Sequence, residues 1–246
     1  MSEAYAKNGR RFSFGGHSCT EFGMIASGVH TFNAPERDLE RIFIPGRNGD
    51  LFRDNGRFKN ITVSYPVAIF EDFAANAEKA RRWLLSDGTY KRLTDGYNPE
   101  YFRLGVFIGP VNFDMKLLNR VGEVSLMFDC KPQRFLISGE TPLTFYASST
   151  LKNDYFPALP LIRVYGSGDG TVTVGDTTVK VFDLDGSVTL DCELQNAYQE
   201  NGEGAAENWN NHIYAPEFPT LQPGSNAVSW TGGVSRLEIT PRWWTL

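Results

Sequence analysis

Histidine and cysteine are the side chains that most often serve as general base, nucleophile or metal ligand, and this chain has three of each. His17 follows a Phe-Gly-Gly turn, His30 lies in a strand-like stretch, and His212 lies in a long polar loop. None stands at ligand or general-base spacing from another reactive side chain, and the chain contains no GxSxG motif. We therefore predict no catalytic residue, no metal site and no cofactor, and expect a protein that is not an enzyme.

The spacing of the cysteines also argues against a metal site. Cys19, Cys130 and Cys192 lie far apart with no CxxC pair, which argues against a disulfide framework and against a structural zinc site. Two of them end apolar, strand-like runs, where a free thiol usually behaves as a small buried hydrophobe. With no apolar run of signal-peptide or membrane-helix length, the sequence predicts a soluble protein without a membrane contact, assembled in a reducing cytoplasm.

Two glycine-rich stretches resemble ligand loops only superficially. Residues 165–174, YGSGDGTVTV, lack the following helix that a phosphate loop needs, and residues 183–187, DLDGS, lack the acid of a calcium loop at its twelfth position. Both stretches are expected to be hairpin turns, because Gly and Asp tolerate positive φ.

The elements around these residues are predicted to be mainly β. Most of the chain alternates apolar and polar residues between turn signals, which is typical of antiparallel strands in a sandwich or barrel. One segment, about 71–87, instead repeats apolar residues at helical spacing, with Phe73, Ala77, Ala80 and Leu84 on one face. Glu78 is spaced to pair with Arg82, and Gly88 is expected to end this single helix.

A Pro- and Gly-containing stretch suggests a domain boundary near residue 137. The predicted domains are 1–136, an antiparallel β domain with one helix, and 137–246, a β-sandwich. The net charge of −5, with cations spread along the chain, makes a dedicated nucleic-acid binder improbable.

Residues 41–60, RIFIPGRNGDLFRDNGRFKN, are the candidate contact surface. Pro45 and the Asn-Gly pair favour a tight hairpin that projects from a sheet with arginine at its tip. Arginine is enriched at protein interfaces, so we assign partner or oligomer contacts to Arg47, Asn48, Arg53 and Arg57. A merely solvated hairpin fits the residues equally well.

Aromatic residues of the second domain offer an alternative. Carbohydrate-binding sandwiches stack sugars on exposed aromatic faces, and the candidates for such faces are Trp209, Trp243 and Trp244. Alternation predicts that one of the two adjacent tryptophans faces the core. These residues suggest an alternative function, a carbohydrate-binding β-sandwich protein that attaches directly to cell-wall glycans.

The ordered set of local motifs resembles the distal tail proteins of bacteriophages with long, non-contractile tails. FSFGGHSCTEFGM, with Phe22 and Gly23, is similar to the family's opening, and IFIPGRNGDL is similar to its Gly-Arg-Asn/Asp-Gly loop. The family's helix and the strands after it are similar to ARRWLLSDGTYKRLTDGYNPEYFRLG. The closing strand of its N-terminal domain is similar to VSLMFDCKPQRF, and its C-terminal domain is similar to the segments from PALPLIRVYGSGDGTVTV to LEITPRWW. The resemblance spans nearly the whole chain.

That resemblance implies a structural protein of the virion tail tip. It implies a homohexameric hub ring built from the N-terminal domains, with galectin-like C-terminal sandwiches outside it. The implied partners are the tail tube protein, a tail-associated protein of the tail tip and a receptor-binding protein. DNA would be cargo in the central channel, and the negative net charge suits such a conduit. An upper-baseplate or tube-like relative with the same fold is a third reading.

Overall fold

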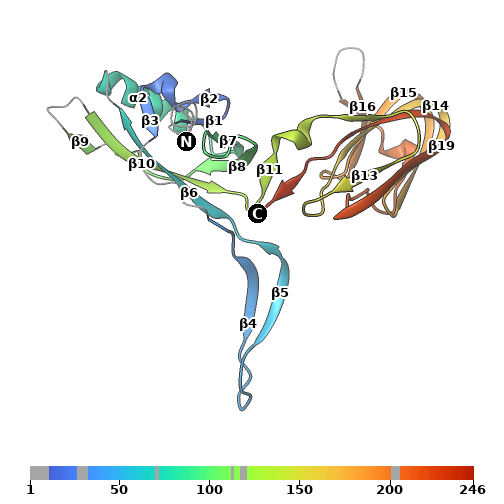
Figure 1. Ribbon diagram of the computed structural model, residues 1–246, viewed down its shortest axis with the longest axis horizontal. Helices are drawn as coiled ribbons and strands as arrows, with labels where there is room; N and C mark the ends of the chain where they lie inside the picture. Colours follow the sequence, from blue (N-terminus) through green and yellow to red (C-terminus); the bar gives the residue numbers. More distant parts are fainter. Residues whose placement is uncertain (1–10, 27–32, 70–71, 112–113, 117–120, 201–205) are drawn as a thin grey trace. The chain divides into compact units, whose positions relative to one another are not determined.

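The computed structural model describes residues 11–26, 33–69, 72–111, 114–116, 121–200 and 206–246. The chain divides into two compact units (Figure 1). The N-terminal unit comprises Met1–Arg134 with Leu246, and the C-terminal unit comprises Phe135–Thr245. The expected fold class is confirmed: the protein is mainly β, and its described part contains one α-helix.

The main sheet of the N-terminal unit is antiparallel, with strand order β2-β1-β7-β8-β10-β6-β3, and β9 pairs with β10. Its elements are β1 (Phe12–Phe14), β2 (His17–Ser18), the 3-10 helix η1 (Cys19–Phe22), β3 (Met24–Ala26), β6 (Ile61–Ile69), α2 (Phe73–Leu84), β7 (Lys91–Asp95), β8 (Tyr101–Phe107), β9 (Asp114–Lys116) and β10 (Val121–Cys130). A separate two-stranded sheet is formed by β4 (Arg37–Ile42) and β5 (Leu51–Phe58).

Aromatic side chains fill the core of this unit. Phe12 stacks on Tyr65 with ring centroids 4.7 Å apart, and Phe128 meets Phe12, Phe14 and Tyr65 at tilted or edge-on angles. Such offset and edge-on pairs add about 0.5–1.5 kcal/mol each beyond the area that they bury.

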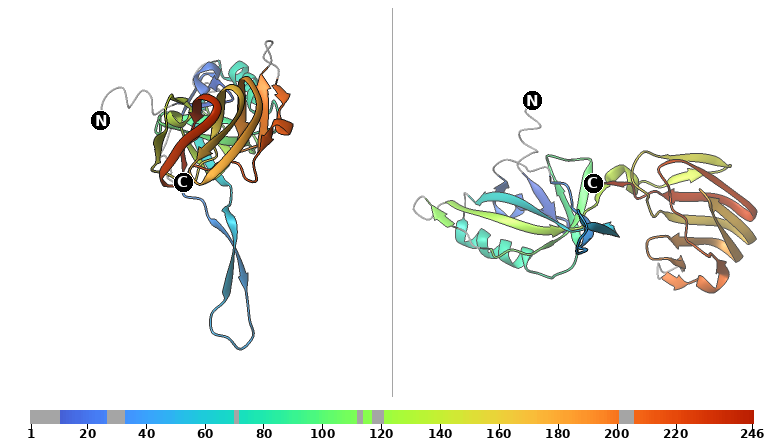
Figure 2. Two further views of the ribbon diagram at one scale, coloured as in Figure 1. Left: turned by 90° about the vertical axis from the view of Figure 1, so that its right-hand side faces the viewer. Right: turned by 90° about the horizontal axis from the view of Figure 1, so that it is seen from below.

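Helix α2 covers this core with the predicted face (Figure 2). Ala77, Ala80 and Leu84 are buried, as the spacing predicted, and Trp83 is buried beside them. The helix is shorter than the expected 71–87: it begins at Phe73 and ends at Leu84, three residues before the expected end at residue 87. Residue 71 lies outside the described part of the chain.

The predicted helical ion pair was wrong in its partner. Glu78 pairs with Arg81 at 2.8 Å, so the i,i+3 contact replaces the expected i,i+4 contact with Arg82. Both spacings place side chains on neighbouring positions of a helix surface, and rotamers decide between them. Arg82 is thereby left without an ion pair to any described residue.

The C-terminal unit is built on one curled antiparallel sheet with order β12-β19-β14-β15-β16-β17, in which β13 pairs with β19 and β18 with β15 (Figure 1). The strands of this sheet are β12 (Leu143–Phe145), β13 (Ser149–Asn153), β14 (Leu161–Val174), β15 (Thr177–Asp191), β16 (Asn196–Glu200), β17 (Ala206–Asn208), β18 (Ile213–Tyr214) and β19 (Gly224–Thr240), with 3-10 helices η2 (Ile137–Glu140) and η3 (Asn210–His212). Two further strands, β11 (Arg134–Leu136) and β20 (Trp244–Thr245), pair with each other and are not part of this sheet. Alternate valine, leucine and isoleucine residues along β14, β15 and β19 point into the curl and form its core.

The two glycine-rich stretches are not the expected hairpin turns. Residues 165–174 run inside β14, whose register shifts between Gly166 and Gly170, and Asp185 and Gly186 lie inside β15. A side chain at Gly166 or Gly233 would collide with backbone of the neighbouring strand. The glycines therefore allow long strands to bend and approach closely, a role that local turn propensity does not reveal.

Candidate interaction surfaces

The β4–β5 hairpin projects from the rest of the N-terminal unit (Figures 1 and 2). We call residues 36–59 the arm. Every residue of β5 before Phe58 is exposed, and β4 and β5 pair only with each other among the described strands. An isolated two-stranded hairpin is marginally stable in water at best, and its outer edges offer free backbone groups. The arm therefore has the properties of a segment that a partner completes.

The arm's charges largely neutralise one another across the two strands. Five ion pairs join the strands or their ends: Glu36–Lys59, Arg37–Asp54, Asp38–Arg57, Glu40–Arg53 and Arg41–Asp50, at 2.7–3.5 Å. Exposed pairs of this kind contribute only about 0–1 kcal/mol each, so they fix the register more than they stabilise the hairpin.

Apolar side chains lie on both faces of the arm. Cross-strand partners share a face, and the register pairs Arg41 with Phe52 and Ile42 with Leu51. One face therefore carries Leu39 and Phe52, which are 43% and 59% exposed, and the opposite face carries Ile42 and Leu51, each 38% exposed. Phe43, next to the tip, is 73% exposed. A hairpin with apolar groups on both faces suits insertion between two surfaces better than docking on one.

The structure separates the four predicted contact residues into two pairs. Arg53 and Arg57 are exposed, but each is bound to an acidic side chain of the arm itself. Arg47 and Asn48 are exposed at the tip, and neither side chain forms an ion pair or hydrogen bond with a described residue. Arg47 is thus the arm's uncompensated cation.

The tip is wider than the tight turn that Asn48-Gly49 suggested. β4 ends at Ile42 and β5 starts at Leu51, so residues 43–50 form an eight-residue loop. Both Gly46 (φ +78°) and Gly49 (φ +80°) adopt the left-handed conformation. Two separate glycine turns, one after Pro45 and one after Asn48, make the loop longer than the two-residue hairpin expected. The apolar arm residues were missed at the sequence level because alternation alone does not show that a hairpin lacks a covering layer.

The candidate glycan-facing tryptophans do not form an open platform. Trp243 is 8% exposed, so its assignment to a glycan-facing surface was wrong. Trp244 is partly buried, stacks on Phe156 at 4.7 Å and donates through Nε1 to the carbonyl of Pro157. Trp209 stacks on His212 at 4.3 Å. Each of the two partly exposed rings therefore has one face covered by another ring.

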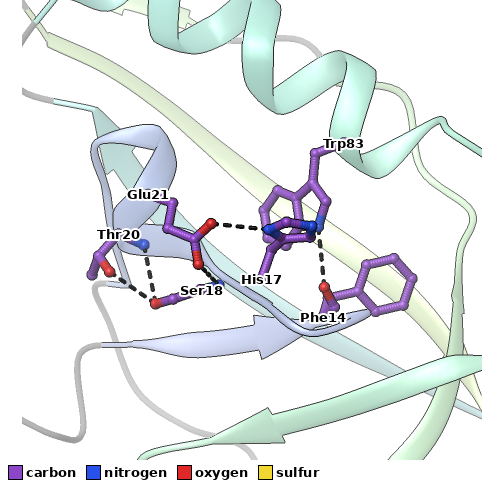
Figure 3. Close-up of polar contacts among 6 residues, drawn as sticks. All are labelled: Phe14, His17, Ser18, Thr20, Glu21 and Trp83. Carbon is purple, nitrogen blue, oxygen red and sulfur yellow. Dashed lines mark hydrogen bonds and ion pairs between the residues drawn. The ribbon is translucent and has the colours of Figure 1, made fainter.

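The described histidine and cysteine side chains that could take part in chemistry are either paired with a neighbouring side chain or buried. His17 pairs with Glu21 at 2.9 Å, and the backbone N–H of Ser18 together with His17 lowers the pKa of the Glu21 carboxyl group (Figure 3). All three cysteines are buried and free, and burial raises the pKa of Cys130 and of Cys192 to about 12. No cluster of metal-ligating side chains occurs among the described residues. His30 lies outside them.

A small polar and aromatic assembly joins β1, η1 and α2. The Trp83 indole reaches from α2 to β1, where Nε1 donates a 3.1 Å hydrogen bond to the carbonyl of Phe14 (Figure 3). Its ring lies 4.4 Å from that of Phe22 and nearly parallel to it. Ser18 caps η1, and the Glu21 carboxylate accepts from the Ser18 backbone at 2.8 Å. This assembly holds one side of α2 against the N-terminal strands.

No helix in the described part of the chain has the length and apolar character needed to span a membrane. No protein-family model and no curated protein sequence matches the chain.

Several solved structures match the chain, among them the following two. One is the crystal structure of the SPP1 Dit protein (gp 19.1), described as a paradigm of the hub adsorption apparatus in phages that infect Gram-positive bacteria. The match between the two has a TM-score of 0.74 and 14% sequence identity, and it covers 96% of this chain and 99% of the SPP1 Dit chain. The other is the phage p2 baseplate in its activated conformation with Sr, with a TM-score of 0.49, 8% identity, and coverage of 93% and 96%. The chain thus has the fold of SPP1 Dit.

Proposed function

We propose that the protein is a structural, non-enzymatic component of the tip of a long, non-contractile phage tail. In this proposal it forms a homohexameric hub ring that joins the tail tube protein to the tail-associated and receptor-binding proteins of the tip. The ring leaves a channel for DNA, is assembled in the host cytoplasm and carries galectin-like C-terminal domains. The likeness of fold to SPP1 Dit over nearly the whole chain supports this role.

The observation that carries the proposal is the arm. A closed ring of identical subunits needs a heterologous interface, in which one patch of a subunit meets a different patch of its neighbour. The arm is suited to be one of these patches, because it projects, exposes Phe43 and Phe52, and has unpaired outer strand edges. Burying those two phenylalanine side chains in a neighbour stabilises the contact by about 2 kcal/mol each.

The charge balance agrees with DNA as cargo. The arm contains six cations and five anions, and its single excess charge is at Arg47. The whole chain has a net charge of −5, so its long-range field repels a nucleic-acid backbone.

Attachment to cell-wall glycans remains the competing function. It depends on aromatic faces open to a sugar, and Trp243 is buried while Trp209 and Trp244 are each stacked on another ring. We therefore rank it below the hub proposal.

The test is electron microscopy of the purified protein over a concentration series, with mass photometry in parallel. We expect six-fold rings with a central hole for the native chain and monomers for the double variant Phe43→Ser/Phe52→Ser. Tyr146→Ser is the matched control, because the side chain of Tyr146 is 74% exposed, close to the 73% of Phe43, but lies in the C-terminal unit. Rings of another order, or rings that persist in the double variant, contradict the proposal. Monomers of the native chain at every concentration contradict self-assembly and make a glycan array the next experiment.

A further inference from the structure

The N-terminal unit has a second surface with the features of a binding site, separate from the arm. A pocket of about 460 Å³ opens between the β1–β2 turn, η1 and the outer face of α2. From α2 it is lined by Lys79, Arg82 and Trp83, and Ser86 follows at the helix end. Arg82, Trp83 and Ser86 follow Lys79 by three, four and seven positions, which places all four residues along one side of the helix. We call this surface the basic pocket.

The wall of the basic pocket is aromatic and rigid. Trp83 is only 8% exposed and is held by its hydrogen bond to the Phe14 carbonyl (Figure 3). Phe22 stacks on it with an interplanar angle of 8° and is partly exposed, so its ring forms the accessible part of the wall. The aliphatic stem of Lys91 passes directly over Gly15, since a side-chain carbon at Gly15 would lie 2.9 Å from Lys91 Cδ. An apolar side chain entering the pocket therefore meets preformed apolar surface, which reduces the entropic cost of binding.

The rim carries positive charge that no side chain of the described residues neutralises. Lys91 is neutralised by Asp87 at 2.7 Å, and His17 faces Glu21. Lys79 and Arg82 are exposed and form no ion pair with any described residue, whereas the adjacent Arg81 is paired with Glu78. Two cations that no described residue pairs with thus lie beside an aromatic ring, in a chain whose net charge is −5.

We propose that the basic pocket binds an acidic segment of another protein that carries an aromatic or large aliphatic anchor residue. The anchor packs on the partly exposed ring of Phe22 and on the aliphatic stem of Lys91, and carboxylates of the segment pair with Lys79 and Arg82. Interfaces of this kind combine a buried apolar anchor with a charged rim, and charge complementarity selects the partner. Because the pocket lies on α2 and not on the arm, this proposal does not depend on ring formation.

The chemistry favours a protein segment over a nucleic acid. A phosphate backbone is bound by rows of cations that follow it, and here two free cations border one pocket. An inorganic anion would pair with the cations but would make no apolar contact with the aromatic ring of Phe22.

The experiment is selection of a displayed library of random 12-residue peptides on the immobilised full chain. The best peptide is then measured by fluorescence anisotropy against the native chain, the charge reversal Lys79→Glu/Arg82→Glu and the control Arg81→Glu. We expect the enriched peptides to place Asp or Glu next to Phe, Trp or Leu. We expect the double reversal to weaken the best peptide about tenfold or more, and Arg81→Glu to change its affinity less than about twofold. Replacing the anchor residue of the peptide with Ala should weaken binding similarly.

Three results would overturn the inference. The first is the absence of enriched acidic peptides. The second is equal binding of the enriched peptides by the native chain and the double reversal, with circular dichroism showing both folded. The third is full competition by inorganic phosphate at millimolar concentration, which would reveal an ordinary anion site. If the first result is accompanied by loss of ring formation in the double reversal, the occupant of the pocket is a second copy of the chain.

Discussion

Arg57 Nε donates a 2.7 Å hydrogen bond to the carboxylate of Asp38 across the β4–β5 hairpin. This hydrogen bond lowers the pKa of the Asp38 carboxyl group below its ordinary value. Arg57 is thus used inside the arm, whereas Arg47 at the tip has no ion-pair partner among the described residues. Two arginines of the same motif therefore have different roles: one organises the arm and the other is available to a partner.

The first prediction separates these roles. Arg47→Ala should weaken self-association by about 1–2 kcal/mol, because an interfacial arginine loses its contacts to the neighbour. Arg57→Ala should cost less than about 1 kcal/mol, because it removes one exposed pair within the arm. Sedimentation equilibrium of both variants measures the difference. Equal losses, or a larger loss for Arg57→Ala, would show that the tip does not carry the contact.

A second prediction concerns the ion pair that ties the end of β15 to the segment after β19. Arg242 donates to both carboxylate oxygens of Asp191, at 2.8 and 3.1 Å, and the backbone N–H groups of Glu193 and Leu194 also donate to Asp191. Burial by itself would raise the pKa of Asp191, but the hydrogen bonds from Arg242 and the backbone outweigh it and the pKa is lowered. The pair therefore favours the folded state whenever Asp191 is ionised.

Asp191→Asn should reduce the free energy of unfolding of the C-terminal unit by about 1.5–3 kcal/mol at pH 7. Because the folded-state pKa is depressed, this contribution is complete above the ordinary aspartate pKa of about 4 and is lost as the pH falls through the lower folded-state pKa. Calorimetry of native and variant chains from pH 7 downward tests it. A difference that does not change with pH would refute the linkage.

The close approach of β14 and β19 yields a third prediction. A methyl group at Gly233 would collide with the backbone oxygen of Ser167. Gly233→Ala should therefore destabilise the C-terminal unit by about 2–3 kcal/mol, as overpacking does elsewhere. Thermal unfolding followed by circular dichroism measures the shift. Gly88→Ala serves as the control, because a side-chain carbon there meets no atom within 4 Å and should change stability by less than about 0.5 kcal/mol.

A fourth prediction follows from the buried thiols. Burial raises the pKa of Cys130 and of Cys192 to about 12, and it also raises that of Cys19. The thiolate is the reactive form, so none of the three should react rapidly with a disulfide reagent at pH 8 in the folded protein. In guanidinium chloride all three should react, since an exposed cysteine has a pKa of about 8.5. Rapid labelling of any one thiol in native buffer would show that its burial is incomplete or transient.

Much of the fold is determined by local patterns in the sequence. Alternation of apolar residues is enough to specify strands, and the spacing of Phe73, Ala77, Ala80 and Leu84 is enough to specify the helix, because each pattern maps onto one face of one element. The arm was visible in the same way, as two strands flanking a Pro- and Gly-containing tip. The free, buried cysteines also follow from their positions in apolar runs.

Only the tertiary structure decided which side chains meet. It placed Arg53 and Arg57 beside acids of the opposite strand, because the cross-strand register depends on a bulge between Arg37 and Leu39 that sequence patterning does not encode. It placed Arg47 in the tip loop, where no described residue forms an ion pair with it. It turned the expected glycine turns into bends of long strands, because three neighbouring strands share the curl. It buried Trp243, and it brought Phe22 from η1 onto Trp83 of α2, far apart in the chain, to form the wall of the basic pocket. Periodicity assigns a residue to a face of its own element, but what covers that face is set by packing between distant segments.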